Sequence, residues 1–366
     1  MPVSALRKLL EETPPWSIGV PVLATLLLAG VWTRPLGATL FGIVMAVLVA
    51  AVIAAVHHAE VIALRLGEPF GTLVLALSVT IIEVSLIVAL MLSGDSTTSA
   101  LARDTVFATV MIICNGVVGL CLLLGATRHH VLAFRVDGTS PALSVLATLT
   151  TLTLVLPTFT VSTPEPTLTP AQLVFAGVVS LALYLSFVFV QTVRHREFFL
   201  PVDVGPEEPH AIMPSFPTVA LGLLLLILSL VAVVGLAKVL APGIGAIVEA
   251  TATPRAAVGV VIALIVLLPE TWAALRAAMR NRMQTSFNLA LGSALATIGL
   301  TIPTVAATSL LLDLPLTLGL PAKEIALLAL TLLISSVTLS RGLATVLQGA
   351  VHLVLFAVFL FLTVRP

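Results

Sequence analysis

The sequence predicts an all-α integral membrane protein with about eleven transmembrane helices. Of its 366 residues, 59% are hydrophobic and only 9% are charged, whereas a soluble domain carries about 25% charged residues. Apolar runs of roughly 17–25 residues, the length that crosses a bilayer as a helix, recur along the chain. The alternating segments of about ten residues that build transmembrane strands do not occur. The 17 basic and 17 acidic residues balance, so membrane lipid is expected around the chain and nucleic acid is not expected as a partner.

The expected spans divide the chain into an N-terminal part and two halves. Residues 1–34 hold the N-terminal segment and the first span, residues 35–193 a first five-helix repeat, and residues 216–366 a second. Between the halves, residues 194–215 are polar and contain four prolines. This stretch is too short and too rich in proline for a domain, so we expect a cytoplasmic linker. The spans are expected near residues 16–32, 36–58, 69–93, 102–125, 140–157, 170–193, 216–238, 255–280, 284–307, 321–340 and 342–364.

The distribution of lysine and arginine predicts the orientation. With the N-terminus in the cytoplasm, eleven of these residues fall on the inside and six on the outside, and basic residues accumulate on the cytoplasmic side of membrane proteins. An odd number of spans then places the C-terminus outside. The first apolar run lacks a small-residue cleavage site, so we expect a retained span rather than a cleaved signal.

Two acidic residues lie where the spans should be apolar. Glu83 lies in the middle of Phe70–Ser93, a run without any other charge, and Glu270 follows the twelve uncharged residues Val258–Pro269. An ionised group at this depth costs at least about 2.5–3.5 kcal/mol on insertion scales, so such residues usually serve a function. Their spans are the third and the eighth, and so cross the membrane in opposite directions. Secondary transporters built from inverted repeats place their binding site at the repeat interface.

Two carboxylates that face each other in a poorly solvated site repel, and each then holds a proton more tightly. One Ca²⁺ or about two protons would satisfy such a pair, which favours exchange over uniport. Ca²⁺ takes six to eight oxygen ligands, while Na⁺ or K⁺ exchange against protons is allowed by the same site. We expect no cofactor besides the transported ions. Further oxygens could come from Asn115, Ser293, Thr297 and Thr80 and from the backbone carbonyls near Ala76 and Ala263.

The segments around both acids resemble the calcium/cation antiporter superfamily, in its bacterial calcium/proton antiporter branch, some members of which handle sodium or potassium. The resembling segments are Gly67–Thr72 and Leu77–Val84 in the first half, and Pro269-Glu270, Arg280–Gln284 and Asn288–Pro303 in the second. The resemblance implies one N-terminal helix followed by two inverted five-helix repeats, in the bacterial inner membrane. It also implies that Glu83 and Glu270 are cation and proton ligands, that Asn115 and Thr297 occupy equivalent polar positions of the following spans, and that Ser293 occupies another. Met111 stands where the second repeat has Ser293.

Two other classes of protein compete with a transporter. An intramembrane enzyme needs a nucleophile with a base, or a metal-activating cluster, and the sequence lacks the motifs His-Glu-x-x-His, Gly-x-Ser-x-Gly and an intramembrane Glu-Glu-x-x-Arg. A channel is less suited to two buried acids in unlike halves. The face of the last span that carries His352 and Gln348 is expected to pack on the bundle through hydrogen bonds. Homo-oligomerisation is left open.

Overall fold

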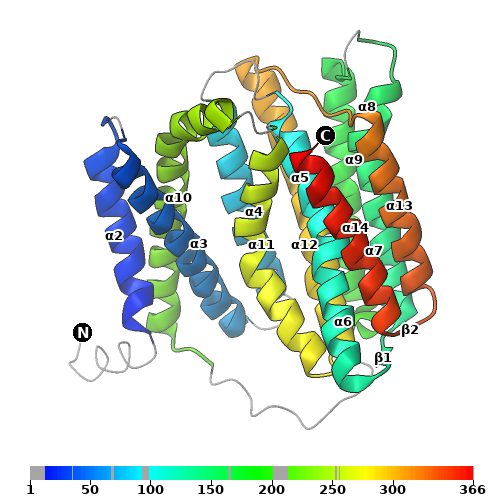
Figure 1. The fold of residues 1–366 in the computed structure, drawn as a ribbon. Helices are drawn as coiled ribbons and strands as arrows, with labels where there is room; N and C mark the ends of the chain where they lie inside the picture. Colours follow the sequence, from blue (N-terminus) through cyan, green and yellow to red (C-terminus); the bar gives the residue numbers. More distant parts are fainter. Residues whose placement is uncertain are drawn as a thin grey trace. The chain divides into compact units, whose positions relative to one another are not determined.

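The computed structural model describes residues 13–34, 36–66, 70–92, 99–163, 166–200, 213–251, 254 and 256–365, and these are almost entirely helical (Figure 1). Within these ranges, nine helices are long and apolar enough to cross a membrane, and two shorter apolar helices accompany them. The chain is therefore an all-α membrane protein. The α-helices are α2 (Pro15–Val31), α3 (Ala38–Leu66), α4 (Phe70–Met91), α5 (Leu101–Met111), α6 (Val118–His129), α7 (Val136–Thr150), α8 (Leu156–Phe159), α9 (Pro170–Phe189), α10 (Phe216–Thr251), α11 (Ala256–Met279), α12 (Met283–Leu312), α13 (Ala322–Leu339) and α14 (Val346–Val364).

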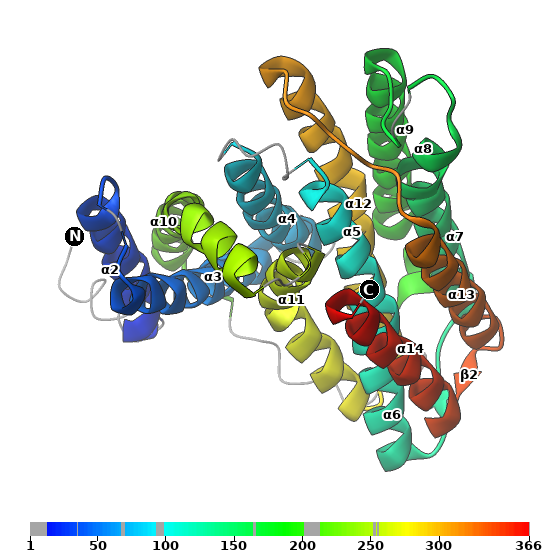
Figure 2. The same ribbon diagram turned by 45° about the horizontal axis from the view of Figure 1, so that its top comes forward.

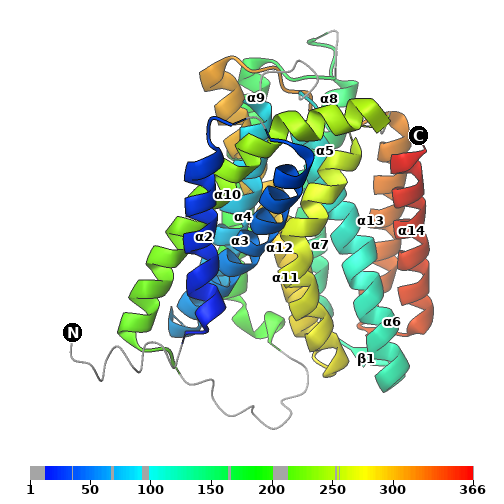
Figure 3. The same cartoon turned by 60° about the vertical axis from the view of Figure 1, so that its left-hand side comes forward.

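Short π-helical stretches join some of these helices into longer runs. They are η2 (Ile112–Val117) between α5 and α6, η3 (Thr151–Val155) between α7 and α8, and η4 (Val190–Arg194) after α9. With these joins, every span expected from the sequence coincides with a helical run. The boundaries of two spans were wrong, because α3 continues to Leu66 and α10 to Thr251. Figure 3 shows that α10 bends before its C-terminal end, and Pro242 inside this helix removes a backbone hydrogen bond.

Two compact units make up the fold, and each is described separately. Unit one comprises Met1–Gly94 and Pro206–Ala252, and unit two comprises Asp95–Gly205 and Thr253–Pro366. Each unit therefore takes segments from both halves of the sequence. The division into two five-helix repeats stays a prediction.

Unit one consists of α2, α3, α4 and α10, and α10 packs against the other three. Polar contacts tie the ends of these helices together. The ring nitrogen Nε2 of His58 lies 2.7 Å from the carbonyl oxygen of Ser17, and Arg65 donates to the carbonyl oxygen of Pro214 at 3.0 Å. The ring of His57 lies 5.0 Å from that of Trp16. The adjacent histidines therefore hold α2 on α3.

Unit two is built around α12, which packs against α11, α9 and α7. On another side of this unit, α14 lies along α6 (Figure 2). Strands β1 (Leu132–Ala133) and β2 (Leu343–Ala344) pair antiparallel, with Leu132 opposite Ala344. This two-residue ladder joins the turn after α6 to the turn after α13. Gly342, with φ of 68°, supplies the left-handed backbone that this turn requires.

Capping residues fix where α9 and α14 begin. Thr169 and Gln172 form a reciprocal capping box at α9, and Thr345 and Gln348 form another at α14. In the second box, Gln348 Oε1 accepts from the backbone nitrogen of Thr345 at 2.9 Å. Gln348 therefore caps its own helix. The expectation that it packs on the bundle through hydrogen bonds was wrong for this residue.

The first residues of the expected linker are anchored in unit two. The 3₁₀ helix η5 (Arg196–Phe199) follows α9 and η4. Asn288 on α12 donates to the carbonyl oxygen of Phe199 at 2.6 Å, and Gln284 donates to Asn288 at 3.0 Å. Gln284 in turn accepts from the backbone nitrogen of Arg135 at 2.7 Å. Residues 201–212 of the expected linker lie outside the described residues.

The close contact of α14 with α6 predicts a stability effect. A Cβ at Gly349 would lie 2.5 Å from the backbone nitrogen of Leu123, so Gly349→Ala must push the two helices apart. We expect a loss of about 1–3 kcal/mol of unfolding free energy, measured by thermal unfolding in detergent. Gly42→Ala on α3 is the control, since its Cβ meets nothing within 4 Å. Equal midpoints for the two variants would contradict the packing.

Candidate functional site

Glu83 lies near the middle of α4 in unit one. It is the fourteenth of the 22 residues of this helix, and its side chain is only 1% exposed. Thr80, 4% exposed, precedes it by three residues and so lies on the same face of the helix. Ala76, whose backbone carbonyl is the other expected ligand, belongs to α4 and precedes Glu83 by seven residues, or about two helical turns.

In unit two, two close backbone contacts fix the direction of α11 against the run from α5 to α6. A Cβ at Gly259 would lie 3.0 Å from the backbone nitrogen of Thr105, and a Cβ at Gly125 would lie 3.3 Å from the carbonyl oxygen of Ala278. Residues near the start of the two segments thus lie side by side, and so do residues near their ends. The two segments run side by side in the same direction (Figure 3).

This register places Glu270 level with the π-helical stretch η2. Glu270 follows Gly259 by eleven residues, and eleven residues beyond Thr105 the chain reaches Gly116, next to Asn115. α11 packs against η2, so the acid and the amide lie at the same depth of unit two. The π-helical geometry adds an extra residue to the turn, a feature that frequently marks functional sites.

The hairpin of α11 and α12 returns a polar residue to the same depth. Glu270 precedes the last residue of α11, Met279, by nine positions, and nine positions beyond Met283 the chain reaches Gly292, next to Ser293. The two helices pack against each other. Ser293 therefore lies level with Glu270 within unit two.

The remaining expected ligands of unit two share these helix faces. Thr297 follows Ser293 by one turn and is 2% exposed. Ala263, 1% exposed, precedes Glu270 by seven residues, or about two helical turns, and lies on the same side of α11. The acid Glu270 itself is partly buried, and its Oε2 atom is buried.

Asn115 belongs to a buried hydrogen-bond network that connects three elements of unit two. Its Nδ2 donates to Thr331 Oγ1 on α13 at 2.9 Å, and Thr331 donates to the sulfur of Met111 at 3.5 Å. His352 Nδ1 on α14 donates to Asn115 Oδ1 at 3.2 Å. His352 Nε2 then accepts from Thr338 Oγ1 at 3.1 Å. A neutral imidazole with its proton on Nδ1 satisfies both contacts.

The expectation that His352 packs through hydrogen bonds is confirmed. Sequence reasoning missed the partners on α13, Thr331 and Thr338. They lie seven residues apart and so share one face of a helix that is otherwise mainly apolar. That spacing was the available signal.

Neutral oxygen and amide groups, rather than fixed positive charges, line the depth of Glu270 in unit two. Neither α12 (Met283–Leu312) nor the segment 105–127 contains lysine or arginine. Among the residues that the structure describes, no three His, Cys, Asp or Glu side chains cluster as a metal site requires. A cation bound here would therefore depend on few carboxylates and on neutral oxygens.

Two other acids of unit two, Asp104 and Glu197, have charged neighbours. Asp104 at the start of α5 forms an ion pair with Arg103 at 2.7 Å, and Arg103 also donates to the carbonyl oxygen of Gly319 at 3.0 Å. This pair ties α5 to the segment before α13. Beyond the spans, a backbone hydrogen bond and the neighbouring His195 hold the pKa of Glu197 below its ordinary value.

The two acids belong to different units, Glu83 to unit one and Glu270 to unit two. The structure brings Glu270 to the depth of Asn115 and Ser293, and it places Thr80 on the face of Glu83. A single pocket that contains both acids stays a prediction.

Comparisons with known proteins define the class. The family model described as sodium/calcium exchanger protein matches residues 36–193 and 221–365, so the chain belongs to this family of membrane cation exchangers. It is thus a transporter and not an enzyme, and the resemblance noted in the sequence is confirmed.

Particular relatives extend over nearly the whole chain. The y4hA protein of Sinorhizobium fredii (strain NBRC 101917 / NGR234) is 47% identical, over 99% of this chain and 100% of its own length. The sodium-potassium/proton antiporter ChaA of Escherichia coli (strain K12) is 36% identical, over 83% of each chain. The solved structure of native YfkE superposes with a TM-score of 0.71 at 15% identity, over 96% of this chain and 98% of that one. The H⁺/Ca²⁺ exchanger CAX gives 0.70 at 14% identity, over 98% and 89%. At these identities the two structures support the fold alone.

The buried network predicts a thermodynamic coupling between His352 and Thr338. His352→Leu leaves Asn115 Oδ1 and Thr338 with a lost partner, and we expect a loss of about 1–3 kcal/mol of unfolding free energy for each group left unsatisfied. Adding Thr338→Val to His352→Leu should cost less than the sum of the single changes, because the shared hydrogen bond is already absent. Thermal unfolding of the four proteins completes the cycle. Strict additivity would contradict the hydrogen bond.

Proposed function

We propose that the chain is a cation/proton antiporter in which Glu83 and Glu270 bind the transported cation and protons in alternation. One observation carries the proposal: each acid lies near the middle of an apolar helix. Glu83 is the fourteenth of 22 residues in α4, and Glu270 is the fifteenth of 24 in α11. Ionisable residues at such a depth are expensive and mark ion pathways or proton relays.

The coupling follows from the cost of charge in a medium of low dielectric. In this proposal the charge of each ionised acid is balanced by a cation that arrives and leaves, because an ionised group is costly at this depth. Protons and a metal cation both do this. A two-glutamate site emptied of both kinds of cation would hold two negative carboxylates, which is the costly state. The protein therefore changes access with one kind of cation bound, and exchange results.

The remaining ligands in this proposal are neutral. Asn115, Ser293 and Thr297 in unit two and Thr80 in unit one would supply side-chain oxygens, with carbonyls near Ala76 and Ala263. The amide oxygen of Asn115 accepts from His352, and a carbonyl oxygen has a second lone pair. The network thus leaves this oxygen able to turn one lone pair toward a cation. His352 acts as a positioning residue for Asn115.

Ca²⁺ is the first candidate for the transported cation, because two carboxylates match its charge and hard oxygen ligands match its preference. Na⁺ or K⁺ is the second candidate, and a specific observation favours it. The relative that is 36% identical over 83% of each chain is named a sodium-potassium/proton antiporter. We further propose the bacterial inner membrane, with the N-terminus inside and the C-terminus outside, from the distribution of basic residues.

Neutralising either acid should abolish exchange. We expect Glu83→Gln and Glu270→Gln each to eliminate Ca²⁺ uptake driven by a pH gradient into proteoliposomes, since one remaining carboxylate cannot alternate between a divalent cation and two protons. The exposed acid Glu197 supplies the control, and Glu197→Gln should keep wild-type flux. Unchanged flux in both glutamate variants would refute the proposal.

The choice between the two candidate cations needs one assay. Vesicles with an internal pH dye and an imposed pH gradient receive CaCl₂, NaCl or KCl in separate runs. We expect Ca²⁺ to dissipate the gradient at concentrations at which Na⁺ and K⁺ do not. Dissipation by Na⁺ or K⁺ alone would assign the same site to monovalent exchange, and dissipation by none of the three would contradict cation/proton antiport.

A further inference from the structure

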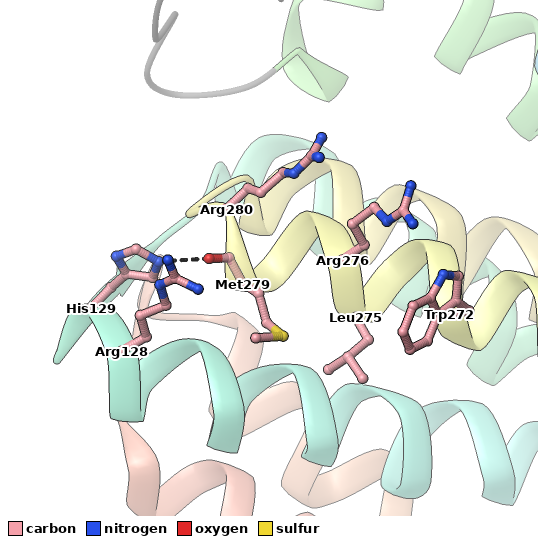
Figure 4. Close-up of a pocket in the computed structure, with 7 residues that line it drawn as sticks. All are labelled: Arg128, His129, Trp272, Leu275, Arg276, Met279 and Arg280. Carbon is pink, nitrogen blue, oxygen red and sulfur yellow. Dashed lines mark hydrogen bonds between the residues drawn. The ribbon is translucent and has the colours of Figure 1, made fainter.

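A basic hollow opens between the C-terminal ends of α6 and α11 in unit two (Figure 4). Its volume is about 530 Å³, and it is lined from α6 by Arg128 and His129 and from the end of α11 and the residue after it by Trp272, Leu275, Arg276, Met279 and Arg280. We call these seven residues the basic pocket. Three of them are arginines and none is acidic, so the pocket attracts an anion.

The two walls of the pocket are fastened together. His129 Nε2 donates to the carbonyl oxygen of Met279 at 3.0 Å, and Figure 4 shows this bond at the mouth of the pocket. Nearby, the tight approach of Gly125 to Ala278 holds α6 and α11 in close contact. The arginines that line the hollow therefore belong to two helices held in contact and not to one flexible segment.

The pocket lies at the depth where a membrane meets water. Met279 ends a membrane-length helix, and Trp272 precedes it by seven residues, a rise of about 10 Å toward the membrane interior. Trp272 is 63% exposed. Tryptophan is enriched at the headgroup level of bilayers.

The guanidinium of Arg276 lies 5.8 Å from the centre of the Trp272 ring. The long arginine side chain can lie along the apolar surface of the helix and keep its charge at the headgroup level. On the α6 side of α11, Leu275 and Met279 provide an apolar surface beneath the charges (Figure 4). The pocket thus combines a charged rim, an aromatic side chain and an apolar floor.

We propose that the basic pocket binds the phosphodiester headgroup of an anionic phospholipid. Guanidinium groups match phosphate oxygens with paired hydrogen bonds, and basic pockets between transmembrane helices on the cytoplasmic side bind such headgroups. The apolar floor favours a lipid over a soluble phosphate, because an acyl chain can cover Leu275 and Met279. Arginines that only set the orientation of the chain would not need to line one hollow together with a tryptophan.

This site touches the helix that carries Glu270, six residues before Arg276. A lipid that bridges α6 and α11 would stabilise their contact. The proposal concerns lipid binding and does not depend on which cation is transported, so its test does not use transport.

Trp272 itself reports occupancy. The full-length chain with Trp16→Phe and Trp32→Phe keeps Trp272 as its sole tryptophan. It is placed in two series of bilayers, in which the mole fraction of brominated phosphatidylglycerol or of brominated phosphatidylcholine is raised in the same steps. We expect the anionic lipid to quench Trp272 at a mole fraction several-fold lower than the neutral lipid. Arg128→Gln should reduce this preference about fivefold, as expected for one arginine near the surface, and Arg128→Lys should retain most of it. Arg128 is chosen because Arg276 contacts the reporter directly.

Arg341→Gln is the matched control, since Arg341 is exposed in unit two and does not line the pocket. It should keep the full preference. Equal quenching of the parent protein by both lipids would overturn the proposal without any arginine variant. If Arg128→Gln and Arg341→Gln reduce the preference for the anionic lipid equally, general surface charge explains it and the proposal is overturned. If millimolar inorganic phosphate relieves the quenching, the pocket binds a soluble anion and the proposal is likewise overturned.

Discussion

The cost of placing negative charge inside a membrane is the constraint on which the functional interpretation depends. Glu83 and Glu270 each lie near the middle of a predominantly apolar helix, and insertion of each as an ion costs at least about 2.5–3.5 kcal/mol. Asp104 shows the ordinary solution, a neighbouring arginine at 2.7 Å. No lysine or arginine occurs in α4, in α12 or in the segment 105–127. In the proposed function, exchangeable cations supply the counter-charge of the two glutamates when these are ionised.

The polar network around Asn115 gives unit two a fixed reference at the depth of Glu270. The network joins α13, α14, η2 and α5 by consecutive contacts between five buried side chains: Thr338, His352, Asn115, Thr331 and Met111. A buried network whose members are satisfied rigidifies its surroundings, whereas one lost partner is expensive. The orientation of the Asn115 amide is therefore set by residues far away in the sequence. Such preorganisation suits the role proposed for Asn115, a neutral ligand of the transported cation.

Hydrophobic runs were sufficient to predict the helices, because length and apolar character alone define a membrane span. The depth of Ser293 relative to Glu270 can also be counted along the sequence. α11 and α12 form a hairpin with a short turn, and the two residues lie at nearly equal numbers of residues from that turn. The boundaries of α3 and α10 did not follow, because both helices continue beyond their apolar runs. The sequence also does not predict the π-helical turn at Ile112–Val117. Nor does it predict the hydrogen bond between Asn115 and Thr331, which is 216 residues away. These features depend on packing between distant spans, which a local pattern does not encode.

The central claim is that the two acids release protons when a cation binds. Proton release on addition of Ca²⁺ to the purified protein, measured by calorimetry near neutral pH in buffers of different ionisation enthalpy, tests this directly. The account predicts a release that approaches about two protons per bound ion, the number that two neutralised carboxylates can hold, and none in a variant with both Glu83→Gln and Glu270→Gln. Cation binding without proton release in the wild-type chain, or full release in the double variant, would contradict it.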